Sequence, residues 1–154
     1  MRLPALALAT LLALPLAASA APGEPATTPA YDAALATSLG ADERGMRQYV
    51  LVILKTGPNK MAEGEARNAM FKGHFANMGR LAGEKKLVLA GPLDGKEGRR
   101  GIFVFNTPEI DAAKSWVATD PVIINGEMLA EYHKFYGSAA LMMVNEVHGK
   151  IEKK

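Results

Sequence analysis

Two patterns of apolar residues alternate along this chain: short runs rich in β-branched residues, and longer stretches with an apolar residue every three or four positions. The short runs are typical of buried strands, and they occupy residues 49–54, 86–92, 99–105 and 128–137. The longer stretches are typical of helices packed on one side, and they occupy residues 63–84 and 107–119. The predicted order is therefore strand, helix, strand, strand, helix, strand.

The apolar side of the first predicted helix contains a histidine. Residues on this side follow one another at spacings of four and three, which places them on one face: Ala66, Met70, His74, Met78 and Leu81. The same helix contains Gly73, Gly79 and Gly83, and each glycine weakens a helix interior by about 1 kcal/mol relative to alanine. We expect these glycines to mark a close approach of another backbone or an early end of the helix.

The second predicted helix has a clear beginning and end. Thr107 is expected to cap its N-terminus, with Pro108 as the first helical residue. The helix ends at the sequence Thr119-Asp120-Pro121, because proline disfavours helical geometry in the residue before it. Asp120 therefore falls in the loop that follows.

This order of elements predicts a ferredoxin-like α+β fold (βαββαβ), in which a four-stranded antiparallel sheet carries two helices on one face. A short helical extension at residues 31–47 precedes the domain at 48–137, and a terminal helix with a basic tail follows at 138–154. The second face of the sheet has no helix layer, and dimerisation through it is the simplest way to cover its apolar residues. We therefore expect a homodimer.

The first 20 residues are typical of a secretory signal peptide, because Arg2 precedes an apolar run that ends in small residues suited to signal peptidase. An uncleaved membrane anchor is the alternative, but the run is shorter than the roughly 18 apolar residues that a spanning helix needs. Cleavage between Ala20 and Ala21 would deliver the protein to the periplasm or the exterior without stable membrane insertion. Residues 21–30, rich in Pro, Ala and Thr, would then form a flexible linker.

The composition limits the chemistry of the mature chain. A length of 154 residues suits one domain with a real core. Cysteine is absent, which excludes disulfides, thiolate metal sites and cysteine nucleophiles. The formal charge is +2, and removal of Arg2 leaves it near +1. This balance argues against nucleic acid as a partner.

Histidine is the side chain best suited to proton transfer near neutral pH, and the sequence contains His74, His133 and His148. His74 can be a hydrogen-bonded core residue or a catalytic group, and His148, near the C-terminus, is most simply solvated. Asp120 can cap a local turn or orient a histidine through a hydrogen bond. A metal site made of His74, Asp120 and His133 is a third interpretation, but no local ligand spacing supports it.

Three segments, YVLVILKTGPN, GHFANMGRLAGEKKLVLAGPLDG and GIFVFNTPEIDAAKSWVATDPVIINGEMLAEYHKFYG, resemble the YciI-like (YCII-related) family over residues 48–137. In that family a helix carries a histidine, the next strand ends in an A-G-P motif, and the second helix ends in an A-D-P or T-D-P motif. The resemblance implies a ferredoxin-like fold that dimerises as an α+β barrel, with an active site built on a His–Asp pair.

Matched residue by residue to that family, the pair would be His74 and Asp120, and Gly91 and Pro92 would form the turn that shapes the pocket wall. The segment EYHKFYGSAALM resembles a secreted subgroup, which would make His133 and Tyr136 pocket or interface residues.

We therefore expect a metal-free enzyme that needs no cofactor and uses His74 and Asp120 for general acid–base chemistry on a small organic molecule. Proton abstraction, isomerisation and elimination all suit such a pair. The alternative is a non-catalytic periplasmic dimer, either binding a small ligand or purely structural, in which the His74–Asp120 pair is a buried hydrogen bond that holds a helix to a loop.

Overall fold

The computed structural model describes residues 29–153 of the chain. The chain divides into two compact units, residues 1–31 and 32–154, and the fold described below is that of the second unit. The predicted signal peptide and nearly all of the predicted linker lie outside the described residues. Within the described part, no helix combines the length and the apolar character needed to cross a membrane.

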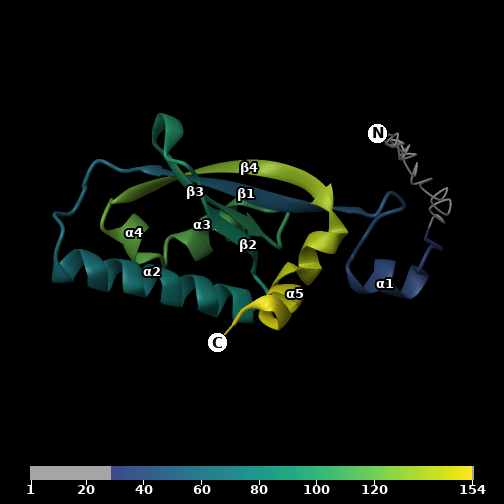
Figure 1. Cartoon of the computed structure of the whole chain (residues 1–154). Coiled ribbons are helices and arrows are strands. Elements are labelled where there is room, and N and C mark those ends of the chain that lie inside the picture. Colours follow the sequence, from purple (N-terminus) through teal and green to yellow (C-terminus); the bar gives the residue numbers. More distant parts are fainter. Residues whose placement is uncertain (1–28, 154) are drawn as a thin grey trace, which may run out of the picture. The chain divides into compact units, whose positions relative to one another are not determined.

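Four strands form a single sheet with the order β2-β3-β1-β4, and all neighbouring strands are antiparallel. The strands are β1 (Met46–Thr56), β2 (Leu87–Pro92), β3 (Arg99–Phe105) and β4 (Met128–Ser138). The helices α2 (Glu65–Gly83), α3 (Ile110–Val117) and α4 (Pro121–Ile124) lie together on one face of this sheet (Figure 1). The predicted ferredoxin-like α+β fold is confirmed.

The helix that carries His74 buries the side that its periodicity predicted, with one difference at its start. Met70, His74 and Leu81 are buried, whereas Ala66 in the first turn is exposed. Asn77 is also buried on this side, although it is polar. The buried side packs on the apolar residues that β1 and β3 direct toward the helices: Val50, Val52, Leu54, Phe103 and Phe105.

The second helix begins later than predicted. Its N-cap is Glu109 and its first residue is Ile110, whereas the sequence pattern placed the cap at Thr107. The prediction was wrong because the hydroxyl of Thr107 accepts a hydrogen bond from the backbone N–H of Glu109. This local bond forms a turn before the helix, a known competitor of helical geometry for Ser and Thr.

The short helix α4 was not predicted. Asp120 has extended backbone geometry, with φ −84° and ψ 125°, so the helix α3 has ended before it, as expected from Pro121. Asp120 then caps a new helix whose first residue is Pro121, a position where proline needs no N–H partner.

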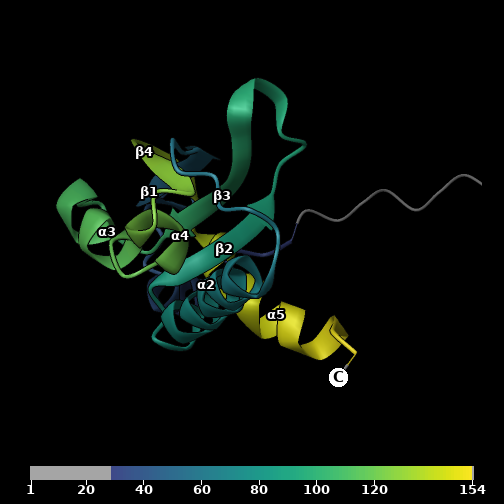
Figure 2. The ribbon, with the colours of Figure 1, turned by 90° about the vertical axis from the view of Figure 1, so that its left-hand side faces the viewer.

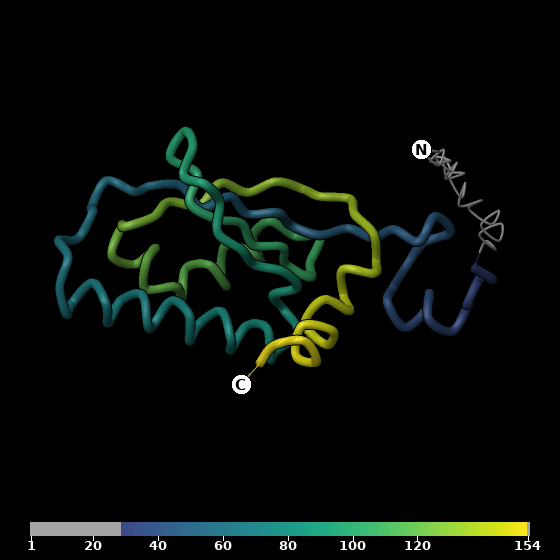
Figure 3. Tube along the Cα trace, in the orientation of Figure 1, coloured from purple at the N-terminus to yellow at the C-terminus, as the bar shows by residue number. Residues whose placement is uncertain are grey.

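The opposite face of the sheet is partly covered by the chain's own C-terminal segment. After β4 the chain forms a 3₁₀ helix, η2 (Ala139–Met143), and the helix α5 (Val144–Ile151). Leu141 and Met142 pack against the buried residues Tyr49, Val88 and Val104 of that face. Figure 3 shows this segment turning away from the end of β4 toward the C-terminal part of α2, with which it lines a shared hollow.

The N-terminal extension contains the short helix α1 (Ala33–Ser38), capped by the side chain of Asp32. None of its residues is buried. Arg47 links the end of this extension to the domain, because its guanidinium donates hydrogen bonds to the Leu39 carbonyl and to Asn106.

Candidate active site

The structure brings His74 and Asp120 together, although they lie 46 positions apart in the sequence. The Nδ1 atom of His74 on α2 lies 2.8 Å from Oδ2 and 3.0 Å from Oδ1 of Asp120. Asp120 is fully buried and His74 is only 7% exposed. The two side chains predicted to form a pair are therefore in direct contact inside the protein.

Asp120 also keeps the local role that was its other interpretation. Its Oδ1 atom accepts a hydrogen bond from the backbone N–H of Val122, 3.1 Å away, and this bond caps α4. The two interpretations of Asp120 are thus compatible, because one carboxylate serves both α4 and the histidine. The bond to Val122 holds the carboxylate in the orientation in which it contacts the imidazole ring.

Gly73 permits the close approach of α4 to α2. A Cβ atom at position 73 would lie 3.0 Å from the Cγ atom of Pro121, which is tighter than ordinary contacts. The sequence pattern suggested such an approach for the glycines of this helix, and the structure shows it at Gly73 alone. Added Cβ atoms at Gly79 and Gly83 would meet nothing within 4 Å.

The loop that carries Asp120 is also held from the side by Asn77, which the sequence analysis did not single out. The Oδ1 atom of Asn77 accepts hydrogen bonds from the Thr119 hydroxyl at 3.0 Å and from Arg80 at 2.7 Å. The only sequence signal for this role is the position of Asn77 three residues after His74, on the same helix face.

The bond to Asp120 decides which ring nitrogen of His74 is available for chemistry. An ionised carboxylate can only accept hydrogen bonds, so Nδ1 carries a hydrogen and donates it. In the neutral ring Nε2 is then unprotonated, with a lone pair that can take up a proton. Three aromatic rings surround the imidazole, with centroids 5.3 to 6.1 Å away: Phe71, Phe75 and Phe103.

His74 lines a cavity of about 260 Å³ between α2 and the sheet. Gly91 and Pro92 from the end of β2 line the same cavity, and their role in substrate binding remains a prediction. The remaining wall is mostly apolar, with the three phenylalanines beside Leu54, Met78 and Met128. A small organic molecule placed in this cavity would contact the histidine in apolar surroundings.

His133 and Tyr136 do not line this cavity. His133 pairs with Leu51 in the sheet and so shares its face, which is opposite to the helices. There its ring nitrogen Nε2 lies 2.8 Å from Glu131. The structure thus places both residues away from this cavity, and their roles as pocket or interface residues remain predictions.

Tyr136 lies near the opposite end of β4 from the cavity residue Met128. Its hydroxyl donates a hydrogen bond to Asp42. This bond raises the pKa of Tyr136 and lowers the pKa of Asp42, because it favours the neutral phenol and the ionised carboxylate. The contact ties β4 to the turn that precedes β1.

The proposed metal ligands His74, Asp120 and His133 do not converge, since His133 lies on the other face of the sheet. Within residues 29–153, no group of three or more His, Cys, Asp or Glu side chains is arranged to hold a metal ion.

The fold and the site together define a ferredoxin-like α+β domain with a buried His–Asp pair at the wall of a small apolar cavity. Residues 48–133 match the YCII-related domain, and the chain belongs to the YCII-related domain family. The family resemblance of the sequence is thus confirmed, while its assignment to a secreted subgroup remains a prediction.

Among solved structures, the chain is similar to 5-chloro-2-hydroxyhydroquinone dehydrochlorinase from Burkholderia phenoliruptrix AC1100, determined in complex with 2,5-dihydroxybenzoquinone. The two sequences are 19% identical, the match covers 56% of this chain and 92% of that chain, and the TM-score is 0.43. A comparison with curated proteins found no match.

Proposed function

We propose that this protein is an acid–base enzyme for a small organic molecule, in which Nε2 of His74 accepts a proton from the substrate and later returns it. The observation that supports this proposal most strongly is the buried 2.8 Å contact between His74 Nδ1 and Asp120. Because Asp120 occupies Nδ1, Nε2 is the nitrogen left for the cavity that His74 lines.

Asp120 assists through both geometry and charge. Its carboxylate holds the imidazole in one orientation and stabilises the imidazolium that forms when Nε2 takes up a proton. Proton abstraction beside a carbonyl group, isomerisation and elimination all include such a transfer. The pair performs this transfer with its own two groups and without a cofactor.

A structural role of the pair is the second candidate, because the same carboxylate caps α4 and the His74 bond joins α4 to α2. In that case the protein would be a non-catalytic binding or structural module. The pair would then contribute to the free energy of unfolding and to nothing else.

Variants of the pair distinguish these candidates. Exchange of carbon-bound protons for deuterium in a panel of small carbonyl compounds can be followed by NMR. If His74 is the base, we expect His74→Gln to slow exchange by about 100-fold or more, and Asp120→Asn to slow it through the wrong ring tautomer. His133→Gln, on the opposite face, is the matched control and should keep the wild-type rate.

Thermal melts of the same variants complete the test. A large drop in melting temperature, together with an unchanged exchange rate in His74→Gln, would favour the structural role over catalysis. A slowed exchange in a variant that melts near the wild-type temperature would support the catalytic role.

We further propose that the protein is exported and that the mature chain begins at Ala21. The support is the charged start, the short apolar run and the small residues before Ala21. Mass spectrometry of protein recovered from the periplasm or the medium should show this N-terminus. Recovery of the full-length chain in the cytoplasmic fraction would contradict the proposal.

A further inference from the structure

Arg100 is the only residue lining the cavity of His74 that carries a permanent charge; the other lining residues described by the structure are apolar side chains, glycines and His74 itself. Arg100 is partly buried, and an anion bound beside it would compensate for the partial loss of water around its charge. This feature is unexplained by proton transfer alone, which needs only His74 and Asp120.

A β-bulge accounts for the position of Arg100. Leu54 of β1 pairs with Gly101, and the next residue, Lys55, pairs with Arg99, which leaves Arg100 as an extra residue on β3. In regular alternation Arg100 would lie on the face opposite to the helices, because Gly101 pairs with the core residue Leu54. Bulges commonly redirect a side chain beside a functional site, and Arg100 is among the residues that line the cavity.

Arg100 has no direct ionic partner within the described residues. In residues 29–153 its guanidinium takes part in no ion pair and no side-chain hydrogen bond, whereas Arg99 pairs with Glu97 at 2.9 Å and Arg67 with Glu127 at 2.9 Å. The pKa of Glu127 is lowered mainly by the Met61 N–H, then by Arg67, and further by the charge of Arg100.

We propose that the cavity binds a small planar organic anion, with its carboxylate or an equivalent anionic group on Arg100 and its conjugated part among Phe71, Phe75 and Phe103. A guanidinium binds a carboxylate through two parallel hydrogen bonds. A cavity of about 150 Å³ already holds benzene, so the 260 Å³ measured here accommodates one ring with a few substituents.

This assignment names the substrate class of the proposed enzyme and rests on the same cavity. Binding of the anionic group at Arg100 fixes the rest of the molecule relative to Nε2 of His74. Arg100 would thus determine specificity and position the substrate, while His74 transfers the proton. A positive charge near the substrate also stabilises negative charge that develops when a proton leaves carbon.

Direct binding tests the assignment without any need for turnover. Benzoate, 2-furoate and sorbate are titrated into the intact mature protein and followed by NMR, each beside its uncharged amide. We expect at least one carboxylate to bind with shifts at the cavity residues and its amide to bind at least about tenfold more weakly. Equal affinity for each carboxylate and its amide, or no binding by any of the three carboxylates, would overturn the assignment.

The variants Arg100→Gln, Arg100→Lys and Arg99→Gln identify the residue responsible. Arg100→Gln should weaken carboxylate binding about tenfold or more, and Arg100→Lys should retain part of it, since lysine keeps the charge but loses the two-pronged geometry. Arg99→Gln is the matched control, one position away and paired with Glu97, and should bind as the wild type does. Equal affinities in Arg100→Gln and Arg99→Gln would refute the role of Arg100.

The same titration separates this inference from the proposed function. His74→Gln should still bind the carboxylate within about threefold, because Arg100 provides the charged contact. If binding depends on Arg100 but no variant of His74 changes proton exchange, the anion site stands and the acid–base function fails. If proton exchange depends on His74 but carboxylate binding does not depend on Arg100, the acid–base function stands and the anion site fails.

Discussion

At the scale of single residues, Gly73 sets the distance between the helix that carries His74 and the helix that Asp120 caps. Gly73→Ala would place a Cβ atom 3.0 Å from the rigid ring of Pro121, whereas Gly79→Ala would meet nothing within 4 Å. Alanine in a helix interior stabilises by about 1 kcal/mol relative to glycine. We expect Gly79→Ala to raise the free energy of unfolding by about that amount and Gly73→Ala to gain none of it, as measured by urea unfolding.

Gly79→Ala is thus the control for Gly73→Ala, because both changes carry the same helix propensity. A gain of equal size in the two variants would contradict the proposed contact with Pro121.

Glu127 offers a prediction for the dependence of stability on pH. Its buried carboxylate accepts hydrogen bonds from the Met61 N–H at 2.7 Å and from Arg67 at 2.9 Å, and the first of these is the largest cause of its lowered pKa. A carboxyl group with a lowered pKa in the folded state stabilises the protein above its ordinary pKa of 4.5, and this contribution is lost as pH falls through the folded-state value.

Glu127→Gln should therefore lower the free energy of unfolding by roughly 2 kcal/mol near pH 7. We expect the difference from the wild type to stay constant down to about pH 5 and then to shrink toward pH 3. Denaturant unfolding of the two proteins across this range provides the measurement. A stability difference that grows as pH falls would contradict the lowered pKa of Glu127 in the folded protein.

The residues of the candidate site differ in how far the sequence could predict them. His74 and Asp120 lie within or directly after helices with an apolar pattern, so their elements could be predicted. Their pairing was expected only from the resemblance to the YCII-related family, because their spacing in the sequence left both interpretations of Asp120 open. The position of Arg100 could not be predicted, because Arg100 is the extra residue of a β-bulge. The apolar pattern of the strand is the same with or without that bulge, so it does not reveal which face Arg100 occupies. The role of Asn77 was not predicted either, because a polar residue on a helix gives no periodic signal of burial.

At the scale of elements, the junction between α3 and α4 positions Asp120. The Thr119 hydroxyl has one hydrogen, which it can donate to Oδ1 of Asn77 at 3.0 Å or to the Trp116 carbonyl at 2.7 Å. Its oxygen also accepts a hydrogen bond from Arg80 of α2 at 3.1 Å, so the hydroxyl links the loop before Asp120 to α2 and α3. Thr119→Val keeps the shape and removes the hydroxyl. We expect the free energy of unfolding to fall by about 1 kcal/mol.

Thr119→Val should also weaken the hydrogen bond between His74 and Asp120. Without the tie to Asn77, the loop is less constrained, and we expect the Nδ1–H proton of His74 to exchange faster with solvent in NMR experiments. Ser115→Ala in α3 removes a comparable exposed hydroxyl bond, to the Ala112 carbonyl, and is the control. Similar proton exchange in the two variants would exclude a positioning role for Thr119.

The boundaries of elements show where local hydrogen bonds overrule periodicity. Strands and the long helix were predictable because their apolar patterns extend over many residues. The start of α3 was not, because a threonine side chain can cap a helix or close a turn before it, and the sequence alone favours neither. The helix α4 spans four residues, too few for any periodic signal.

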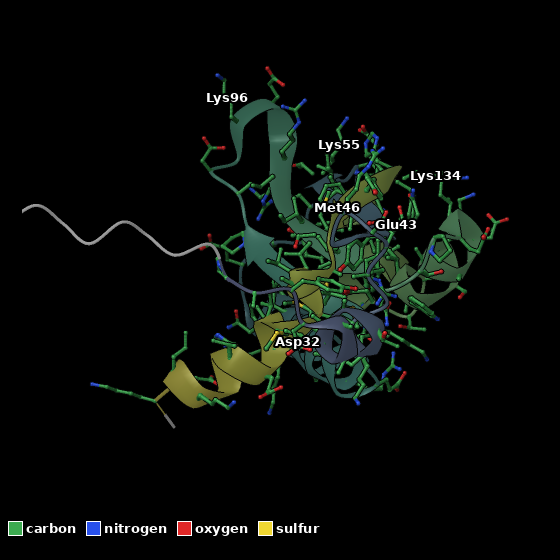
Figure 4. All side chains as sticks on the ribbon, turned by 90° about the vertical axis from the view of Figure 1, so that its right-hand side faces the viewer. Asp32, Glu43, Met46, Lys55, Lys96 and Lys134 are labelled. Atoms are coloured by element: carbon green, nitrogen blue, oxygen red, sulfur yellow. The ribbon has the colours of Figure 1, made fainter. Side chains whose placement is uncertain are left out.

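At the scale of the whole molecule, the sheet faces two environments. One face is covered by α2, α3 and α4, and Figure 2 shows these helices on the same side of the sheet. The β2–β3 hairpin extends beyond the sheet, and Lys96 lies at its tip (Figure 4). On the other face, Leu141 and Met142 cover only the end that contains Tyr49 and Val104.

The part of that face that Leu141 and Met142 leave uncovered supports the prediction of a homodimer. Ile53 of β1 pairs with Ile102 of β3, which also borders the His74 cavity. Both are only partly buried and belong to neither core cluster of the described chain. Their exposed apolar surface lies beside Leu51, which contacts the covered end. Packing against the same face of a second copy would bury this surface in a self-complementary contact.

We therefore expect size-exclusion chromatography with light scattering to give twice the mass of the mature chain. Ile53→Asp would place a charge within this contact and should convert the protein to a monomer that keeps its secondary structure. Ile124→Asp is the matched control, because Ile124 is also an apolar residue, 68% exposed, but lies on α4. A wild-type monomer would contradict the homodimer. A dimer that survives Ile53→Asp and dissociates with Ile124→Asp would place the interface at α4 and not at the sheet.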